Sequence, residues 1–125
     1  LNGEPLRVSA TFSLKESLLA TGFPYNVHER PEKVVRLFEK MIVRSQGVRR
    51  IGSAALDLCY VAAGRLDGFW EESLHPWDTG AGDIVIREAG GRLTTFSGVS
   101  YHPYLKSVVA SNGLIHDEMI RVVGY

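Results

Sequence analysis

The fold is decided by residues 66–98, which read LDGFWEESLHPWDTGAGDIVIREAGGRLTTFSG. The aromatic pair Phe69-Trp70 indicates a strand over residues 66–72, because aromatic side chains fit the pleated surface of a sheet. A helix is expected over residues 78–89, ending at a pair of glycines, and a further strand over residues 92–96. The stretch therefore predicts a strand–helix–strand unit with an aspartate at the start of its helix.

The same alternation continues on both sides of this unit. Residues 53–64 are apolar almost all round apart from Asp57, so this helix should be buried between layers. Strands alternating with helices predict one layered α/β sandwich domain with a mainly parallel sheet. The remaining expected elements are strands at 17–23, 48–52 and 107–110 and helices at 31–45 and 115–123.

The composition is that of an ordinary globular domain, with 125 residues, 45% hydrophobic and 22% charged. Lys+Arg and Asp+Glu both number 14, which argues against a nucleic-acid partner. The single Cys59 cannot form an internal disulfide, which favours a reducing compartment. The sequence has no apolar run long enough to span a bilayer and no signal-peptide pattern. We therefore expect a cytoplasmic protein without a membrane partner.

The first residues predict a turn. Asn2-Gly3 is a strong signal for a hairpin turn whose two central residues both have positive φ. Residues 6–9 would then be the second strand of a hairpin whose first strand precedes Leu1. On this interpretation the sequence is a piece of a longer chain.

Asp78 admits two interpretations. An aspartate at a helix start is typically an N-cap, which accepts hydrogen bonds from free N–H groups and complements the helix dipole. It could also be a metal ligand or general base, since Mg²⁺ prefers carboxylate oxygens, with further ligands from elsewhere. Gly80-Ala81-Gly82 begins like a dinucleotide-binding fingerprint, but the third glycine would fall at Val85. Close helix packing is the better interpretation of these glycines.

Other candidates have weaker patterns. Glu71 and Glu72 should leave their strand in opposite directions, one toward a cleft and one toward solvent. The strand-to-helix junction at residues 52–54 offers free N–H groups that could meet an anion or a hydroxyl, although a plain N-cap is the default. His75 is a lone histidine, which is more often structural than catalytic.

Residues 77–91, WDTGAGDIVIREAGG, resemble the C-terminal signature of the inositol monophosphatase family. Three other pieces fit in order: LNGEPLRVS at the start, GSAALDLCYVAAGRLDGFWE before the signature and ASNG after it. The resemblance covers essentially the whole chain. One departure is Gly80, where the family usually has Ala or Cys; the smaller residue should leave the Asp78 position intact.

The resemblance implies the C-terminal half of the inositol monophosphatase fold, usually a homodimer. It also implies Mg²⁺-dependent hydrolysis of a phosphate monoester, most often inositol monophosphate and in some members fructose 1,6-bisphosphate. Carried over by position, Asp78 resembles a catalytic acid that ligates a metal, and Glu71 resembles a carboxylate that binds a substrate hydroxyl. By the same match, Gly52, Ser53 and Ala54 would line the substrate ring, and His75 and Trp77 would support Asp78.

The family's remaining metal ligands lie in an Asp-Pro-x-Asp-Gly-Thr motif and an upstream Glu-Glu pair. The sequence contains no Asp-Pro, and its Glu71-Glu72 pair lies too far downstream. We therefore expect the N-terminal half to precede Leu1 and residues 1–125 alone to be inactive. Two alternatives stay open: a phosphatase for fructose 1,6-bisphosphate or a related sugar or nucleotide, and a noncatalytic oligomerisation or regulatory module.

Overall fold

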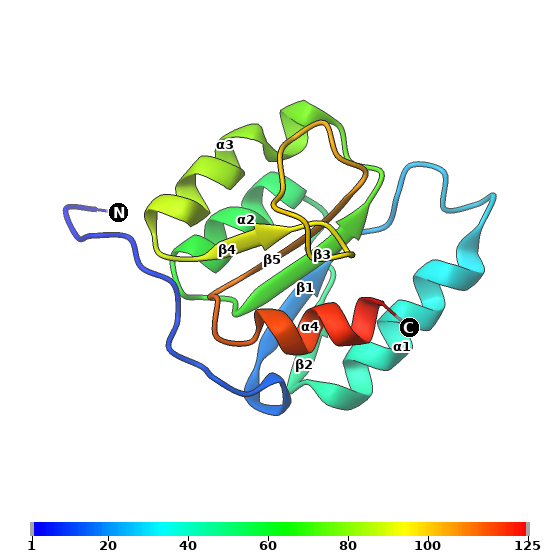
Figure 1. Cartoon of the computed structure of the whole chain (residues 1–125), viewed down its shortest axis with the longest axis horizontal. Coiled ribbons are helices and arrows are strands. Elements are labelled where there is room, and N and C mark those ends of the chain that lie inside the picture. Colours follow the sequence, from blue (N-terminus) through cyan, green and yellow to red (C-terminus); the bar gives the residue numbers. More distant parts are fainter. Residues whose placement is uncertain (1, 125) are drawn as a thin grey trace.

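The computed structural model describes residues 2–124. A sheet lies between two pairs of helices (Figure 1). Helices α2 (Ala54–Ala62) and α3 (Pro76–Glu88) cover one face, and α1 (Pro31–Arg44) and α4 (His116–Val123) cover the other. The predicted layered α/β sandwich is therefore confirmed.

The sheet has five strands within the described chain, and it is mixed rather than mainly parallel. The first three strands of the spatial order run parallel, whereas β5 is antiparallel to both of its neighbours. The reason is the link between β4 and β5: residues 95–106 contain no helix, and a parallel pair needs a crossover, usually helical. The spatial order is β2 (Gly47–Arg49), β1 (Leu18–Thr21), β3 (Gly68–Glu72), β5 (Ser107–Ser111) and β4 (Arg92–Thr94).

Each face of the sheet carries its own hydrophobic core, because successive side chains of a strand point to opposite faces. On β3, Phe69 packs into the core shared with α2 and α3, and Trp70 packs into the core shared with α1 and α4. The neighbouring strand repeats the pattern, with Ala20 in the first core and Leu19 in the second. This alternation places the next residue of β3, Glu71, on the α2/α3 side.

Helix α2 differs from its prediction. Leu58 and Val61 face the core, but Leu56 is 41% exposed and Cys59 is also exposed. The prediction of burial between layers was wrong because α2 has the sheet and α3 on one side only. Its predicted cap is present: the Ser53 hydroxyl accepts a hydrogen bond from the N–H of Leu56 at 3.2 Å.

The first residues are partly as predicted. Asn2 and Gly3 have φ values of 52° and 85°, which fit the predicted turn. The predicted strand at residues 6–9 stays a prediction, because its expected partner precedes Leu1; within the described chain this segment pairs with no strand. The N–H of Val8 instead donates to the carbonyl of Ala89 at 3.2 Å, so the segment follows the end of α3 rather than the sheet.

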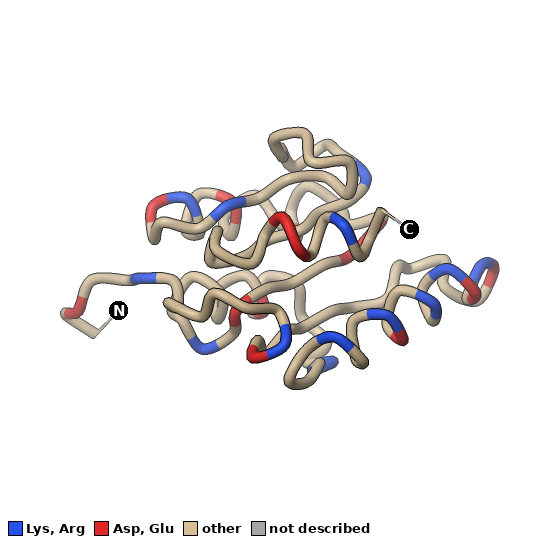
Figure 2. Tube along the Cα trace, turned by 60° about the horizontal axis from the view of Figure 1, so that its bottom comes forward, with Lys and Arg blue, Asp and Glu red and all other residues tan. Residues whose placement is uncertain are grey.

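Charged residues of both signs are spread over the surface, and they alternate along α1 (Figure 2). None of the helices within residues 2–124 is both long and apolar enough to cross a membrane.

Candidate functional site

A pocket of about 500 Å³ opens at the carboxyl edge of the parallel part of the sheet. The strands β1, β2 and β3 are parallel, so their carboxyl ends meet at this edge. Helices α2 and α3 begin there and direct their free N–H groups toward the same space. Such an edge is where ligands bind in open α/β sheets.

The pocket brings together nearly all of the predicted site residues. His75 is the exception: its ring lies outside the lining and stacks on Trp77 at 4.4 Å and near Tyr25 at 5.0 Å. Residues from three separate segments of the sequence therefore converge, although the chemical role of each remains a prediction. The predicted residues in the lining are Gly52, Ser53, Ala54, Glu71, Trp77 and Asp78.

Asp78 lies at the third position of α3 and not at the N-cap, so that prediction was wrong in position. The helix begins two residues earlier, at Pro76, because proline suits the first turn. Oδ2 of Asp78 accepts a hydrogen bond from the backbone N–H of His75, the true N-cap, at 3.0 Å. The hydroxyl of Tyr25 approaches the same oxygen at 3.5 Å. Oδ1 accepts no hydrogen bond from any described residue, and Asp78 is one of the residues that line the pocket.

The negative charge of Asp78 acts on the nearby Tyr25 hydroxyl. It raises the pKa of Tyr25, with smaller effects from burial, the hydrogen bond and Glu71. Tyr25 therefore keeps its proton, and its hydroxyl can donate a hydrogen bond to the Asp78 carboxylate.

Glu71 and Glu72 leave β3 in opposite directions, as predicted. Glu71 is 7% exposed and lines the pocket, whereas Glu72 pairs with Lys33 at 3.1 Å on the other side. Burial raises the pKa of Glu71 to about 8; Arg50 opposes this shift, and Asp57 and Asp78 add to it. Glu71 is thus a carboxyl group that can hold a proton near neutral pH.

Asp57 is a pocket residue that sequence reasoning did not select. It enters from α2, is 1% exposed, and its Oδ1 has no hydrogen-bond partner among residues 2–124. Burial raises its pKa to about 7, while Arg50 lowers it. The sequence did mark Asp57 as the only charge on an apolar helix. The helical pattern alone does not show that this side chain lies in the pocket.

Arg50 supplies positive charge to this acidic pocket. Its guanidinium carbon lies 4.9 Å from the centre of the Phe23 ring, in the range of a cation–π contact. Both residues lie beyond the ends of β1 and β2, although the strands predicted at 17–23 and 48–52 included them. With three acids and one arginine, the pocket can accept hydrogen bonds from hydroxyl groups and bind cationic or phosphorylated ligands.

Mg²⁺ fits this pocket only in part. The residues that the structure describes contain no group of three His, Cys, Asp or Glu side chains that could hold a metal ion. Asp78 can supply one oxygen ligand through Oδ1, but a complete set needs further groups. Within the described residues the pocket therefore offers Asp78 as a single candidate oxygen ligand and not a complete metal site.

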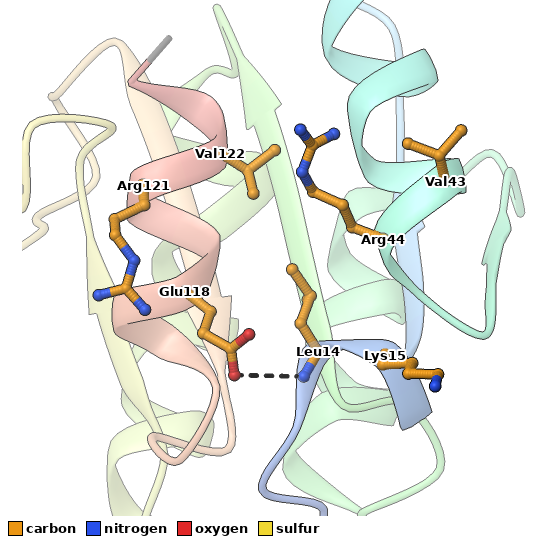
Figure 3. Close-up of a pocket in the computed structure, with 7 residues that line it drawn as sticks. All are labelled: Leu14, Lys15, Val43, Arg44, Glu118, Arg121 and Val122. Carbon is orange, nitrogen blue, oxygen red and sulfur yellow. Dashed lines mark hydrogen bonds between the residues drawn. The ribbon is translucent and has the colours of Figure 1, made fainter.

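A second hollow, of about 480 Å³, lies on the α1/α4 side of the sheet (Figure 3). Glu118 of α4 accepts a hydrogen bond there from the N–H of Leu14, in the 3₁₀ helix η1 (Leu14–Glu16), at 3.3 Å. Lys15, Arg44 and Arg121 also line the hollow. None of the predicted site residues lies in it, and we assign it a packing role that joins α4 to η1.

Known proteins are similar to this chain over nearly its whole length. The chain is 43% identical over 122 residues to "Fructose-1,6-bisphosphatase/inositol-1-monophosphatase" of Thermotoga maritima, covering 98% of this chain and 45% of the relative. It is 42% identical over 120 residues to "Nus factor SuhB" of Escherichia coli K12, covering 96% of this chain and 45% of the relative. The chain thus spans less than half the length of both curated relatives.

Solved structures give the same picture. The inositol monophosphatase of Anabaena (Nostoc) sp. PCC 7120 superposes with a TM-score of 0.94 at 44% identity, covering 98% of this chain and 49% of that one. The model of the family described as "Inositol monophosphatase family" matches residues 1–124. With nearly the whole sequence matched, the chain belongs to the inositol monophosphatase family.

Proposed function

We propose that this chain forms one wall of the active site of a Mg²⁺-dependent phosphatase that hydrolyses a phosphate monoester, with inositol monophosphate as the favoured substrate. The convergence of Asp78, Glu71 and the start of α2 in one pocket carries this proposal. The opposite wall would come from an N-terminal half outside this sequence. That the relatives are more than twice as long supports this division.

Each residue has a separate task in this proposal. Asp78 presents Oδ1 as a metal ligand while Oδ2 holds the start of α3. When bound, Mg²⁺ supplies Lewis-acid stabilisation of phosphoryl charge and lowers the pKa of a bound water. Glu71 accepts or donates a hydrogen bond at a substrate hydroxyl, and the free N–H groups of residues 52–54 face the substrate ring. His75 and Trp77 support Asp78 by stacking on each other.

The acidic character of the pocket favours a polyol over an apolar ester. Asp57 and Glu71 are both buried carboxyl groups with raised pKa values, and hydroxyl groups can serve as donors or acceptors to either protonation state. The full-length enzyme is proposed to be a cytoplasmic homodimer. Fructose 1,6-bisphosphate is the alternative substrate, and a comparison of kcat/KM for both esters decides between them.

The experiment is Asp78→Asn in the full-length protein, assayed on inositol monophosphate across a Mg²⁺ titration. We expect turnover to fall by about a hundredfold or more, because one charged metal ligand is lost, with a melting temperature within a few degrees of the parent. Asp83→Asn, which removes a carboxylate on the same helix that pairs with Arg87, is the matched control. Unchanged turnover in Asp78→Asn refutes the metal role.

A second candidate function is noncatalytic regulation, since one relative carries the name of a Nus factor. This alternative predicts that the full-length protein lacks phosphatase activity with Mg²⁺ present. Activity that is abolished by Asp78→Asn would exclude it as the sole function.

A further inference from the structure

Gly22 is the first residue after β1, and Glu71 occupies the space that a side chain at position 22 would need. A Cβ atom placed on Gly22 would overlap Oε1 of Glu71 and lie 2.8 Å from its Cδ, closer than carbon atoms approach without displacement. The backbone of Gly22 does not need a glycine, because it is not among the described residues with positive φ. The small residue is therefore explained by the Glu71 carboxylate.

The register of the sheet produces this contact. Thr21 pairs with Trp70 in the parallel ladder between β1 and β3, so the next residues, Gly22 and Glu71, continue side by side past the end of β1. The Thr21 hydroxyl fastens this end by donating to the carbonyl of Trp70 at 2.7 Å. Both Gly22 and Glu71 line the pocket.

Little else fixes the Glu71 side chain. Its carboxyl group makes no hydrogen bond with any residue in the range 2–124, although the residue as a whole is only 7% exposed. The space over Gly22 thus decides where the carboxyl group can lie. Asp57, Asp78 and Arg50 act on it electrostatically from the other sides of the pocket.

Building on the proposed function, we infer that Gly22 is a positioning residue that sets substrate specificity. The open space above its Cα holds the Glu71 carboxyl group where it meets a hydroxyl of the substrate's alcohol moiety. A side chain at position 22 would turn Glu71 away from that hydroxyl. Recognition of polyol phosphates would be lost, whereas the phosphate and its metal contacts would not change.

The test compares two substrates in the full-length protein: inositol monophosphate, and p-nitrophenyl phosphate, which has no ring hydroxyls. For Gly22→Ala we expect KM for inositol monophosphate to rise about tenfold, the equivalent of one lost hydrogen bond. The KM for p-nitrophenyl phosphate should stay within twofold. Glu71→Ala should show the same selectivity, and Gly22→Ala/Glu71→Ala should be no worse than Glu71→Ala. Gly80→Ala is the matched control, since a Cβ there meets no described atom within 4 Å.

Equal losses on both substrates, or additive losses in the double variant, would overturn the inference. Thermal melting supplies an arm that needs no activity: Gly22→Ala should lower the melting temperature, and Glu71→Ala in the same chain should restore it by removing the overlapping atoms. Failure of that restoration also overturns the inference. If the parent protein hydrolyses neither ester, the proposed function fails, while the melting arm still decides whether Gly22 and Glu71 are coupled.

Discussion

Replacing Asp57 with asparagine removes a charge from the floor of the pocket while keeping the size of the side chain. Asp57 is 1% exposed and its Oδ1 lacks a hydrogen-bond partner within the described part of the chain. A buried carboxylate in that position is poorly solvated, so the folded state favours its neutral form. Asparagine is always neutral and avoids this penalty.

The size of the effect follows from the pKa of Asp57. Burial raises it from 3.8 to about 7, so the folded state binds a proton more tightly than the unfolded state. Stability from this group is therefore full below pH 3.8 and is lost as the pH rises toward 7. The shift of roughly three units corresponds to about 4 kcal/mol at 1.36 kcal/mol per unit, an upper value for the gain of Asp57→Asn at pH 8.

Urea unfolding followed by the fluorescence of Trp70, which is buried, measures this gain at pH 4 and pH 8. We expect Asp57→Asn to change the free energy of unfolding by less than about 1 kcal/mol at pH 4 and to increase it clearly at pH 8. Glu71, whose pKa burial raises from 4.5 to about 8, should retain a dependence on pH of the same sign in the variant. Asp117→Asn, at an exposed ion pair with Arg92, is the control and should have a small effect at both pH values. Equal changes at both pH values for Asp57→Asn would refute the reasoning.

Two further predictions concern the cores. Burial, aided by Arg92, lowers the pKa of His116 from 6.5 to about 4, so the folded state excludes a proton that the unfolded state accepts. The free energy of unfolding should fall by about 3 kcal/mol as the pH drops from 6.5 to 4. Urea unfolding of the parent and of His116→Gln across this range measures the effect. A difference between the two proteins that does not change with pH would contradict the prediction. Gly82→Ala would place a Cβ 2.6 Å from Cδ1 of Leu58 and should destabilise by about 1–3 kcal/mol. Gly80→Ala lies on the same helix, where an added Cβ has free space, and should stabilise the protein by about 0.5–1 kcal/mol. If the two variants shifted the melting temperature in the same direction, the prediction would be contradicted.

Periodicity predicted the existence of the elements but not the direction of β5. The apolar run at 107–110 identifies a strand, and nothing in it distinguishes parallel from antiparallel pairing. The direction is set by residues 95–106, which return the chain without a helix. The exposed side of α2 could not be predicted for a related reason. An apolar helix pattern does not indicate whether other elements cover one side of the helix or both.

Site residues that lie in a recognisable local sequence pattern were predicted. Site residues that reach the pocket only through the tertiary fold were missed. Asp78 and Glu71 lie in a recognisable stretch, and the structure places both in one pocket. Arg50 and Asp57 reach the same pocket from another loop and another helix, so their relevance depends on tertiary proximity. Gly22 lies within the strand predicted at 17–23, and only the position of Glu71 explains why this residue is small.

The two interpretations of Asp78 are compatible because its two oxygens have different surroundings. Oδ2 accepts hydrogen bonds from His75 and Tyr25, while Oδ1 accepts none from the described residues, and Asp78 lines the pocket. Asparagine offers one oxygen acceptor and one NH₂ donor. Its oxygen would face the His75 N–H, which needs an acceptor, and its NH₂ would face the pocket, where it repels a cation. Asp78→Asn should therefore keep the start of α3 intact and lose metal affinity, and a variant that lost the helix start instead would contradict this division.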